Sequence, residues 1–217
     1  MNIRSFTTFL AAAAFLFTVG SNDAFARKNK DSGETALIEI AETGTSADEV
    51  FMAAKSIHDT LNGIQTKLTE GNNELVSALG LTAGTPFADA LADLKAKAGD
   101  NLSIAMNGAV PSLTVADAAP ENVKSAVASV NNFVTYHVQA IDEAKSLVTQ
   151  AQEVAAKAQS LDPMSLAKEV ATNPMDIPKV AKTITNNLKA VGQTPKRIED
   201  TVTVLGSNVE AIKGLAN

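Results

Sequence analysis

Histidine is the residue type in this sequence best suited to metal, haem or acid–base chemistry, and the chain has two, His58 and His137. His137 is the more informative, because it stands between Val134 and Ile141 where the spacing of apolar residues calls for another one. A buried imidazole needs hydrogen-bond partners. We therefore expect a core histidine that is bonded across a helical bundle to a Ser, Thr, Asn or Asp side chain.

The alternative for His137 is ligation of a b-type haem iron, with a methionine from another helix as the second ligand. No histidine or acidic residue lies three or four positions from His137, which excludes a multi-histidine site. His58, next to Asp59, is better suited to a solvated or interfacial role. We expect no metal and, outside the haem alternative, no cofactor. The candidate second ligands are Met52, Met106, Met164 and Met175.

The motifs of the common catalytic sites are absent. A serine nucleophile would need a histidine, an acidic partner and a tight turn such as G-x-S-x-G, and the last is missing. The phosphate-binding patterns G-x-x-x-x-G-K and G-x-G-x-x-G are missing too. The adjacent carboxylates Asp48-Glu49 and Asp142-Glu143 are typical of solvated helix surface. The sequence therefore predicts a protein that is not an enzyme.

The composition restricts the function further. The chain has no cysteine, which excludes disulfides, thiolate metal sites, a lipoprotein signal and covalent haem attachment. Its net charge is −6, which repels phosphate, and few aromatic residues are present to stack on bases, so nucleic-acid binding is not expected. After residue 26 the only aromatic residues are Phe51, Phe87, Phe133 and Tyr136.

The N-terminus has the pattern of a secretory signal peptide. Arg4 precedes an apolar run over residues 9–19, and Ala24-Phe25-Ala26 matches the small-x-small cleavage site. A transmembrane anchor is the weaker alternative, because the run is shorter than the roughly 20 residues that a spanning helix needs. We expect cleavage after Ala26 and a periplasmic or secreted protein.

The element that must position His137 is the longest uninterrupted segment, residues 120–162, which has no glycine and no proline after Pro120. Its small or apolar residues fall alternately four and three apart, which is a heptad spacing. At 1.5 Å per residue this seam is roughly 54 Å long, so whatever packs on it must also be helical and long. The seam residues are Val123, Val127, Val130, Val134, His137, Ile141, Ala144, Val148, Ala151, Ala155 and Ala158.

A second long helix has the same spacing. Ser46 and Glu49 match a capping box, which predicts that the helix starts there, and the stretch from Gly80 to Gly84 ends it. Gly71 is expected to bend or break it, because glycine lowers helix stability. Its seam residues are Val50, Ala54, Ile57, Leu61, Ile64, Leu68, Gly71, Leu75 and Ala78.

Shorter helices are expected between and after the long ones. Thr85-Pro86 is a helix start and Gly99 a stop, which predicts a third helix between them. Asp162-Pro163 starts a short helix that runs through Val170.

The C-terminal quarter is predicted to contain two helices, one from Pro178 to Gly192 and one that starts at Thr194-Pro195. This part is basic although the whole chain is acidic. Solvated faces and helix-end charges are the ordinary explanation, and a dock for an acidic partner or an anionic lipid surface is the alternative. The basic residues are Lys179, Lys182, Lys189, Lys196 and Arg197.

Residues 101–116 have a different pattern, because apolar and polar residues alternate and an Asn107-Gly108 pair follows. Asn-Gly between apolar runs is a hairpin signal. We favour an ordered loop over the end of the bundle and keep two alternatives, a short β-hairpin and an apolar tongue of the kind that helical pore-forming toxins insert into bilayers. The side chains that would contact a membrane or a partner are Leu102, Ile104, Met106, Leu113 and Val115.

Together these patterns predict an all-α protein, an elongated bundle of long antiparallel helices with heptad spacing. Residues 1–26 are the signal peptide, and residues 27–45 form a flexible leader with an apolar segment at 36–41 for which we favour a helix. Residues 46–217 form the bundle.

The predicted function is protein–protein binding, as a periplasmic or secreted adaptor, scaffold or chaperone-like protein. Heptad seams suit partner helices and also self-association into a homo-oligomer. The first alternative is a membrane-active protein that uses residues 102–115 on a lipid surface. The second is a bundle that binds haem or another small ligand at His137.

Overall fold

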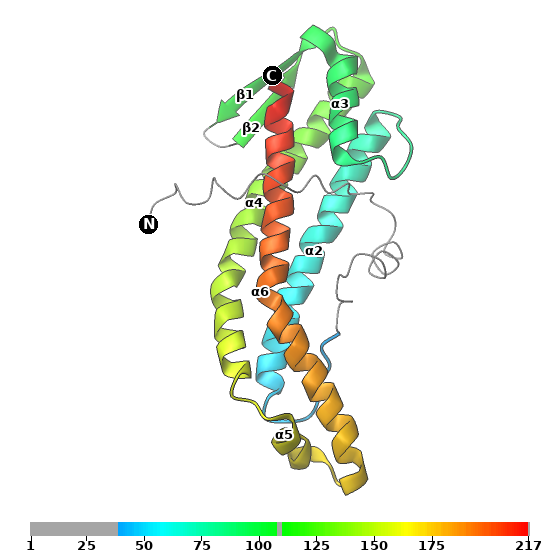
Figure 1. Cartoon of the computed structure of the whole chain (residues 1–217). Coiled ribbons are helices and arrows are strands. Elements are labelled where there is room, and N and C mark those ends of the chain that lie inside the picture. The colour runs from blue at the N-terminus through cyan, green and yellow to red at the C-terminus, as the bar shows by residue number, and fades with distance from the viewer. Residues whose placement is uncertain (1–38, 108–109, 217) are drawn as a thin grey trace.

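A computed structural model gives the fold (Figure 1), and the structure describes residues 39–107 and 110–216. The predicted signal peptide and the first part of the leader, including residues 36–38, lie outside the described residues. Glu39, Ile40 and Ala41 are not helical as we favoured; instead Ile40 is buried among the helices.

Three long helices run side by side along the molecule: α2 (Asp48–Ala78), α4 (Glu121–Ala158) and α6 (Ile177–Lys213). Figure 1 shows that α4 runs opposite to the other two. Two short helices lie at opposite ends, α3 (Phe87–Ala98) at the upper end and α5 (Pro163–Val170) at the lower. The predicted all-α elongated bundle with antiparallel neighbours is confirmed.

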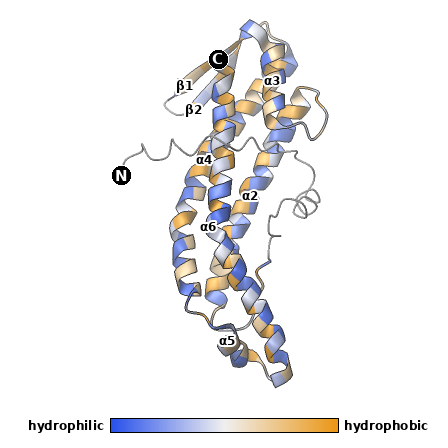
Figure 2. Cartoon of the chain, in the orientation of Figure 1, coloured by the Kyte–Doolittle hydropathy of each residue, from blue (hydrophilic) through white to orange (hydrophobic). Residues whose placement is uncertain are grey.

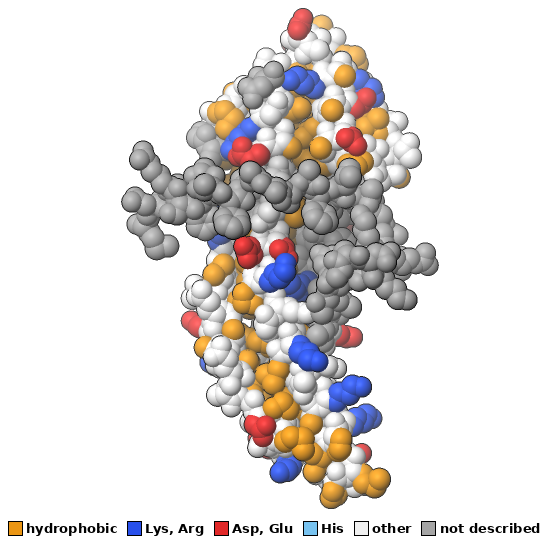
Figure 3. Space-filling model, viewed as in Figure 1, with side chains coloured by type: hydrophobic (Ala, Val, Ile, Leu, Met, Phe, Trp, Pro, Cys, Tyr) orange, Lys and Arg blue, Asp and Glu red, His pale blue; other side chains and the backbone are white. Residues whose placement is uncertain are grey.

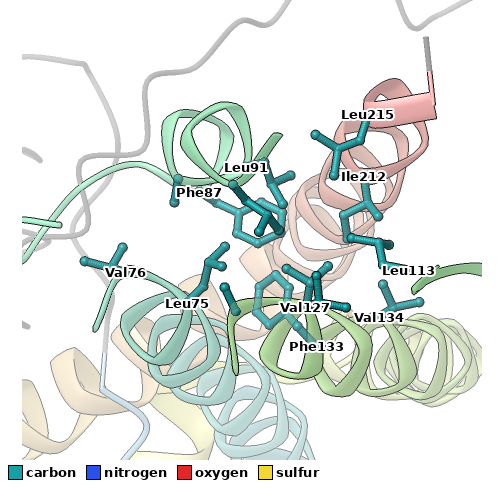
Figure 4. Close-up of a cluster of buried hydrophobic side chains, with 14 of the residues drawn as sticks. Leu75, Val76, Phe87, Leu91, Leu113, Val127, Phe133, Val134, Ile212 and Leu215 are labelled. Carbon is teal, nitrogen blue, oxygen red and sulfur yellow. The ribbon is translucent and has the colours of Figure 1, made fainter. Parts of the chain in front are cut away.

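The heptad seams form the core, because most of their residues are buried between the three long helices, and Figure 2 shows the apolar stripes on these helices. The core has an upper cluster, around Leu75, Phe133 and Ile212 (Figure 4), and a lower cluster, around Ile57 and Ile198.

The seam of α4 drifts in its second half. Val148 is 40% exposed, whereas Leu147 and Val154 are buried in the lower cluster. A straight α-helix with 3.6 residues per turn does not keep a 3.5-residue spacing on one face over many turns. Ala144 and Ala151 are therefore buried as predicted, whereas Leu147 takes the place of Val148 and Val154 that of Ala155.

Residues 102–107 and 110–115 form the two strands of a β-hairpin, not the ordered loop that we favoured. Strand β1 (Leu102–Asn107) pairs antiparallel with β2 (Val110–Val115), and Ile104 lies opposite Leu113. The alternation of apolar and polar residues therefore indicates the local structure here, while Asn107 itself belongs to β1 and pairs with Val110.

The capping box that we predicted at Ser46 does not form. Helix α2 begins at Asp48 after Ala47, without a side-chain cap. The Ser46 hydroxyl instead contacts the Glu169 carboxylate on α5, at 3.0 Å. The Asp48 carboxylate accepts the N–H groups of Thr43 and Gly44, so it fixes the chain that leads into the helix. Long-range and loop contacts thus replace the local motif.

The C-terminal quarter is one helix, not two. Helix α6 continues through Gly192 and Pro195, because Val191, Thr194 and Ile198 are buried and hold it together by packing. The Thr194 hydroxyl donates to the Ala190 carbonyl at 3.3 Å. Proline has no N–H to give to the preceding turn, and Figure 1 shows α6 changing direction about halfway along.

Gly71 does not break α2, which is continuous from Asp48 to Ala78. It lies against Phe133 of α4, so closely that a Cβ at Gly71 would lie 2.3 Å from the phenyl ring. The glycine therefore allows close approach of α2 and α4. The predicted short helix after Asp162 is present as α5, where the Asp162 side chain accepts the N–H of Ser165.

Candidate functional site

His137 belongs to α4 and lies in the core of the bundle with no exposed surface. Its Nδ1 is 2.7 Å from the carbonyl of Phe133, and its Nε2 is 3.0 Å from the amide nitrogen of Asn208 on α6. These partners favour the tautomer in which Nδ1–H donates and Nε2 accepts. Burial lowers the pKa of His137 to about 4, so the ring is neutral at pH 7. The side chain makes the bond across the bundle that we expected of a core histidine.

Iron ligation by His137 would need the Nε2 lone pair, which already accepts from Asn208. Three of the candidate second ligands, Met106, Met164 and Met175, are 48%, 48% and 85% exposed, so they point into solvent rather than toward His137. The haem hypothesis therefore requires rearrangement of the core and gains no support from this geometry.

His58 joins α2 to α6 near Pro195. Its Nε2 lies 2.9 Å from the hydroxyl of Thr194, and both side chains are buried. Burial and, to a smaller extent, the positive charge of Arg197 lower the pKa of His58 to about 4, against the opposing effect of Asp59. The role is therefore interfacial, inside the bundle and not on its surface.

Two asparagines that the sequence patterns did not single out hold extended backbone against the helices. Asn131 of α4 accepts the N–H of Leu113 and donates to its carbonyl, both at 2.8 Å. Asn187 of α6 does the same for Ala41, at 3.1 and 2.6 Å. A side-chain amide has the donor and acceptor of a peptide group, so each asparagine acts like a short piece of neighbouring strand. The sequence feature that could have identified these two residues is a side-chain amide close to an apolar seam.

The hairpin presents most of its apolar side chains to the bundle. Leu113 is 2% exposed, and Leu102, Ile104 and Val115 are half-buried against the upper cluster. Only Met106 of the five residues that we predicted as contacts is largely exposed, at 48%. Insertion of this apolar face into a bilayer would first require the hairpin to leave the bundle.

The first half of α6 carries an exposed row of basic side chains, which we call the lysine face. From Ile177 to Ile198 the helix has five basic residues and no acidic one. Figure 3 shows basic side chains gathered along this part of α6. Lys196 pairs with Asp200, at 3.1 Å, at the upper end of the row. The lysine face consists of Lys179, Lys182, Lys189 and Lys196, all exposed.

The surface depressions found in the described residues are open. One of about 340 Å³ lies between the chain before α2 and the start of α6, lined by Thr43, Val170 and Lys179 among others. Another of about 660 Å³ lies beside Glu70, Glu74 and Ser129. Neither contains a histidine, and residues 39–107 and 110–216 hold no group of three His, Cys, Asp or Glu side chains able to bind a metal.

Within the same described ranges, no helix has the length and apolar character that crossing a membrane requires. No family model, no curated protein and no solved structure matches this chain.

Proposed function

We propose that this chain is an exported, non-enzymatic helical bundle that acts by binding another protein, and that the lysine face of α6 is where an acidic partner docks. The observation that carries the proposal is the charge asymmetry of one helix: five basic residues and no acidic one over Ile177 to Ile198, in a chain of net charge −6. An exposed surface of one charge attracts and orients a partner of the opposite charge.

The heptad seams are not available for this role, although we expected them to suit partner helices. Their residues pack α2, α4 and α6 against one another, so a partner must bind the outer faces. The lysine face is the part of that outer surface where charges of one sign follow a helix at heptad spacing, with Lys182, Lys189 and Lys196 seven residues apart.

An acidic protein surface fits the lysine face better than a lipid surface. Helices that lie on membranes bury an apolar face between the lipids. The apolar face of α6, with Ala181, Ile184 and Val191, is instead buried in the bundle. Membrane binding would therefore be electrostatic only, and strongly weakened by salt.

Charge reversal tests the proposal. Lys179→Glu, Lys182→Glu and Lys189→Glu together should weaken recovery of the partner from the cell envelope at least about tenfold, because rim charges each contribute fractions of a kcal/mol to 1 kcal/mol. The matched control is Lys95→Glu, Lys145→Glu and Lys157→Glu, which changes the total charge equally on other exposed positions. The control should bind as the wild type does.

The readout is affinity capture at increasing salt, with flotation of neutral and anionic vesicles in parallel. Equal loss of the partner in both triple variants would contradict a specific lysine face. Flotation with anionic vesicles that only the α6 variant abolishes, without any captured protein, would move the function to a lipid surface.

A further inference from the structure

The two edges of the hairpin differ, because the outer edge of β2 is closed. The N–H and carbonyl of Leu113 both bond to the side chain of Asn131 on α4. Pro111, two residues earlier in β2, has no N–H to offer. No further strand can therefore pair along β2.

Within residues 39–107 and 110–216 no strand pairs with the outer edge of β1, and the register shows which groups this edge presents. Leu113 lies opposite Ile104 but directs its N–H and carbonyl at Asn131, so the two residues are a non-hydrogen-bonded pair. The N–H and carbonyl of Ile104 consequently point away from β2. Pairing alternates every second residue, so the same holds for Leu102 and Met106. Among the described residues the sheet has only these two strands.

Strand β1 lacks the charges, the proline and the bulge that usually protect an open edge. Exposed edges are usually blocked by charged side chains, proline, bulges or a covering element. No residue from Leu102 to Val115 is charged, β1 contains no proline, and its six pairs with β2 are continuous. Among the described residues, α4 and α6 contact β2, whereas the 3-10 helix η4 (Gly214–Ala216) contacts β1 without a backbone hydrogen bond to it, so the outward N–H and carbonyl groups of β1 stay unpaired there. Figure 1 shows β1 on the outer side of the hairpin.

We infer that β1 pairs with β1 of a second copy of this chain, antiparallel and centred on Ile104, so that the two hairpins form one four-stranded sheet. The pattern of β1 is the same in both directions about Ile104. Leu102 of one copy would lie opposite Met106 of the other, and Ser103 opposite Ala105. Apolar side chains then meet on one face and small ones on the other, and no like charges meet.

The alternation of outward-pointing backbone groups along β1 agrees with this register. The outward groups belong to Leu102, Ile104 and Met106, which are the residues that would exchange backbone bonds in pairs. Met106, which one copy leaves 48% exposed, would gain an apolar neighbour. A hairpin alone is marginally stable, and four strands make a sheet of ordinary size. The interface lies at the end of the molecule away from the lysine face, so it does not depend on the proposed partner.

Sedimentation of residues 27–217 tests the dimer. The wild type should be dimeric at micromolar concentration, and Met106→Pro should raise the dissociation constant at least about tenfold, because it removes an outward N–H. Met106→Ser, which shortens the same exposed side chain but keeps the N–H, should remain largely dimeric. Equal thermal melting of the two variants would show that Met106→Pro still folds.

Engineered cysteines test the register in a chain that has none of its own. Ser103→Cys with Ala105→Cys should form disulfide-linked dimers on oxidation, because the two positions would face each other as a non-hydrogen-bonded pair about 4.5 Å apart at Cα. Ser103→Cys with Asn107→Cys fits only a register centred on Ala105 and should cross-link far less.

A wild type that stays monomeric up to about 0.1 mM would overturn the inference. So would a dimer that Met106→Pro leaves unchanged, or equal cross-linking of the two cysteine pairs. A protein that stays monomeric but binds an extended peptide along β1 would also overturn the inference, because the strand that pairs with this edge would then come from a different protein.

Discussion

His58 and His137 each join α6 to another long helix as neutral rings. His137 of α4 bonds to Asn208 of α6, and His58 of α2 bonds to Thr194 of α6. Burial lowers the pKa of both side chains to about 4, so protonation opposes folding at both positions. The histidines therefore make the packing of α6 sensitive to acid.

The free energy of unfolding should fall as the pH drops through the window from 6.5 to 4. An unfolded histidine binds its proton near pH 6.5 whereas the folded one does not until about pH 4, so the unfolded state binds more protons in between. The expected loss is about 3 kcal/mol for both residues between pH 6.5 and 5.

Urea denaturation across this range measures the loss. The double variant His58→Gln with His137→Gln should remove most of the slope above pH 5, where few carboxylates titrate. A wild type equally stable at pH 6.5 and pH 5 would contradict the burial of neutral histidines.

Asn131 holds the hairpin by two bonds to Leu113. Asn131→Ala should leave a buried N–H and carbonyl without partners, at a cost of about 1–3 kcal/mol, and speed hydrogen exchange at the Leu113 amide about tenfold or more. Asn132→Ala, an exposed neighbour on the same helix, is the control and should change neither quantity. Unchanged exchange at Leu113 in Asn131→Ala would show that the hairpin docks by its apolar face alone.

Sequence patterns predict the core position of His137 and its need for a polar partner, because one polar residue in an apolar seam is conspicuous. They do not predict that the partner is Asn208, because that depends on how α4 and α6 align. The patterns do not identify Asn131 and Asn187, because the helices contain many side-chain amides. Only the fold shows which of these side chains lie against extended backbone.

At the scale of the elements, Gly71 allows α2 to approach Phe133 closely. Gly71→Ala should destabilise the protein by about 1–3 kcal/mol despite the better helix propensity of alanine, because the added methyl group overlaps the ring. Gly63→Ala lies on the same helix, and a Cβ there meets nothing within 4 Å. That control should stabilise the protein by up to about 1 kcal/mol.

Chemical denaturation of the two alanine variants decides between these effects. Stabilisation by both substitutions would mean that Gly71 is only a weak helix residue, as its sequence context alone implies.

The heptad spacing predicts which segments are helical, whereas the residues at which each helix begins and ends depend on tertiary contacts. Pro195 and Gly192 are local stop signals that the burial of Val191, Thr194 and Ile198 overrides. Ser46 and Glu49 match a capping box, yet Ser46 finds Glu169 across the bundle. A local motif does not form where a long-range contact satisfies the same polar groups. The hairpin is the opposite case, because its local alternation of apolar and polar residues indicates the structure.

At the scale of the whole molecule, the lysine face and the open edge of β1 lie toward opposite ends (Figure 1). Two copies joined through β1 would present two lysine faces in one assembly. A partner with two acidic sites could then bind both, with an avidity above that of a single face.

Export predicts that the protein from the cell envelope begins at Arg27. Ala24→Leu with Ala26→Leu should block cleavage and leave a longer form, because signal peptidase requires small residues there. Mass spectrometry of the N-terminal peptide measures this, with Ala13→Leu in the apolar run as the control that should still be processed. Recovery of the wild type with residues 1–26 attached would contradict export by this route.

The most direct measurement is photo-cross-linking in the source cell from two positions, Lys182 on the lysine face and Lys145 on α4. We expect one discrete adduct with an acidic protein from Lys182, lost when Lys179→Glu and Lys189→Glu are added, and no such adduct from Lys145. The same adducts from both positions, or none from Lys182, would contradict a function based on this face.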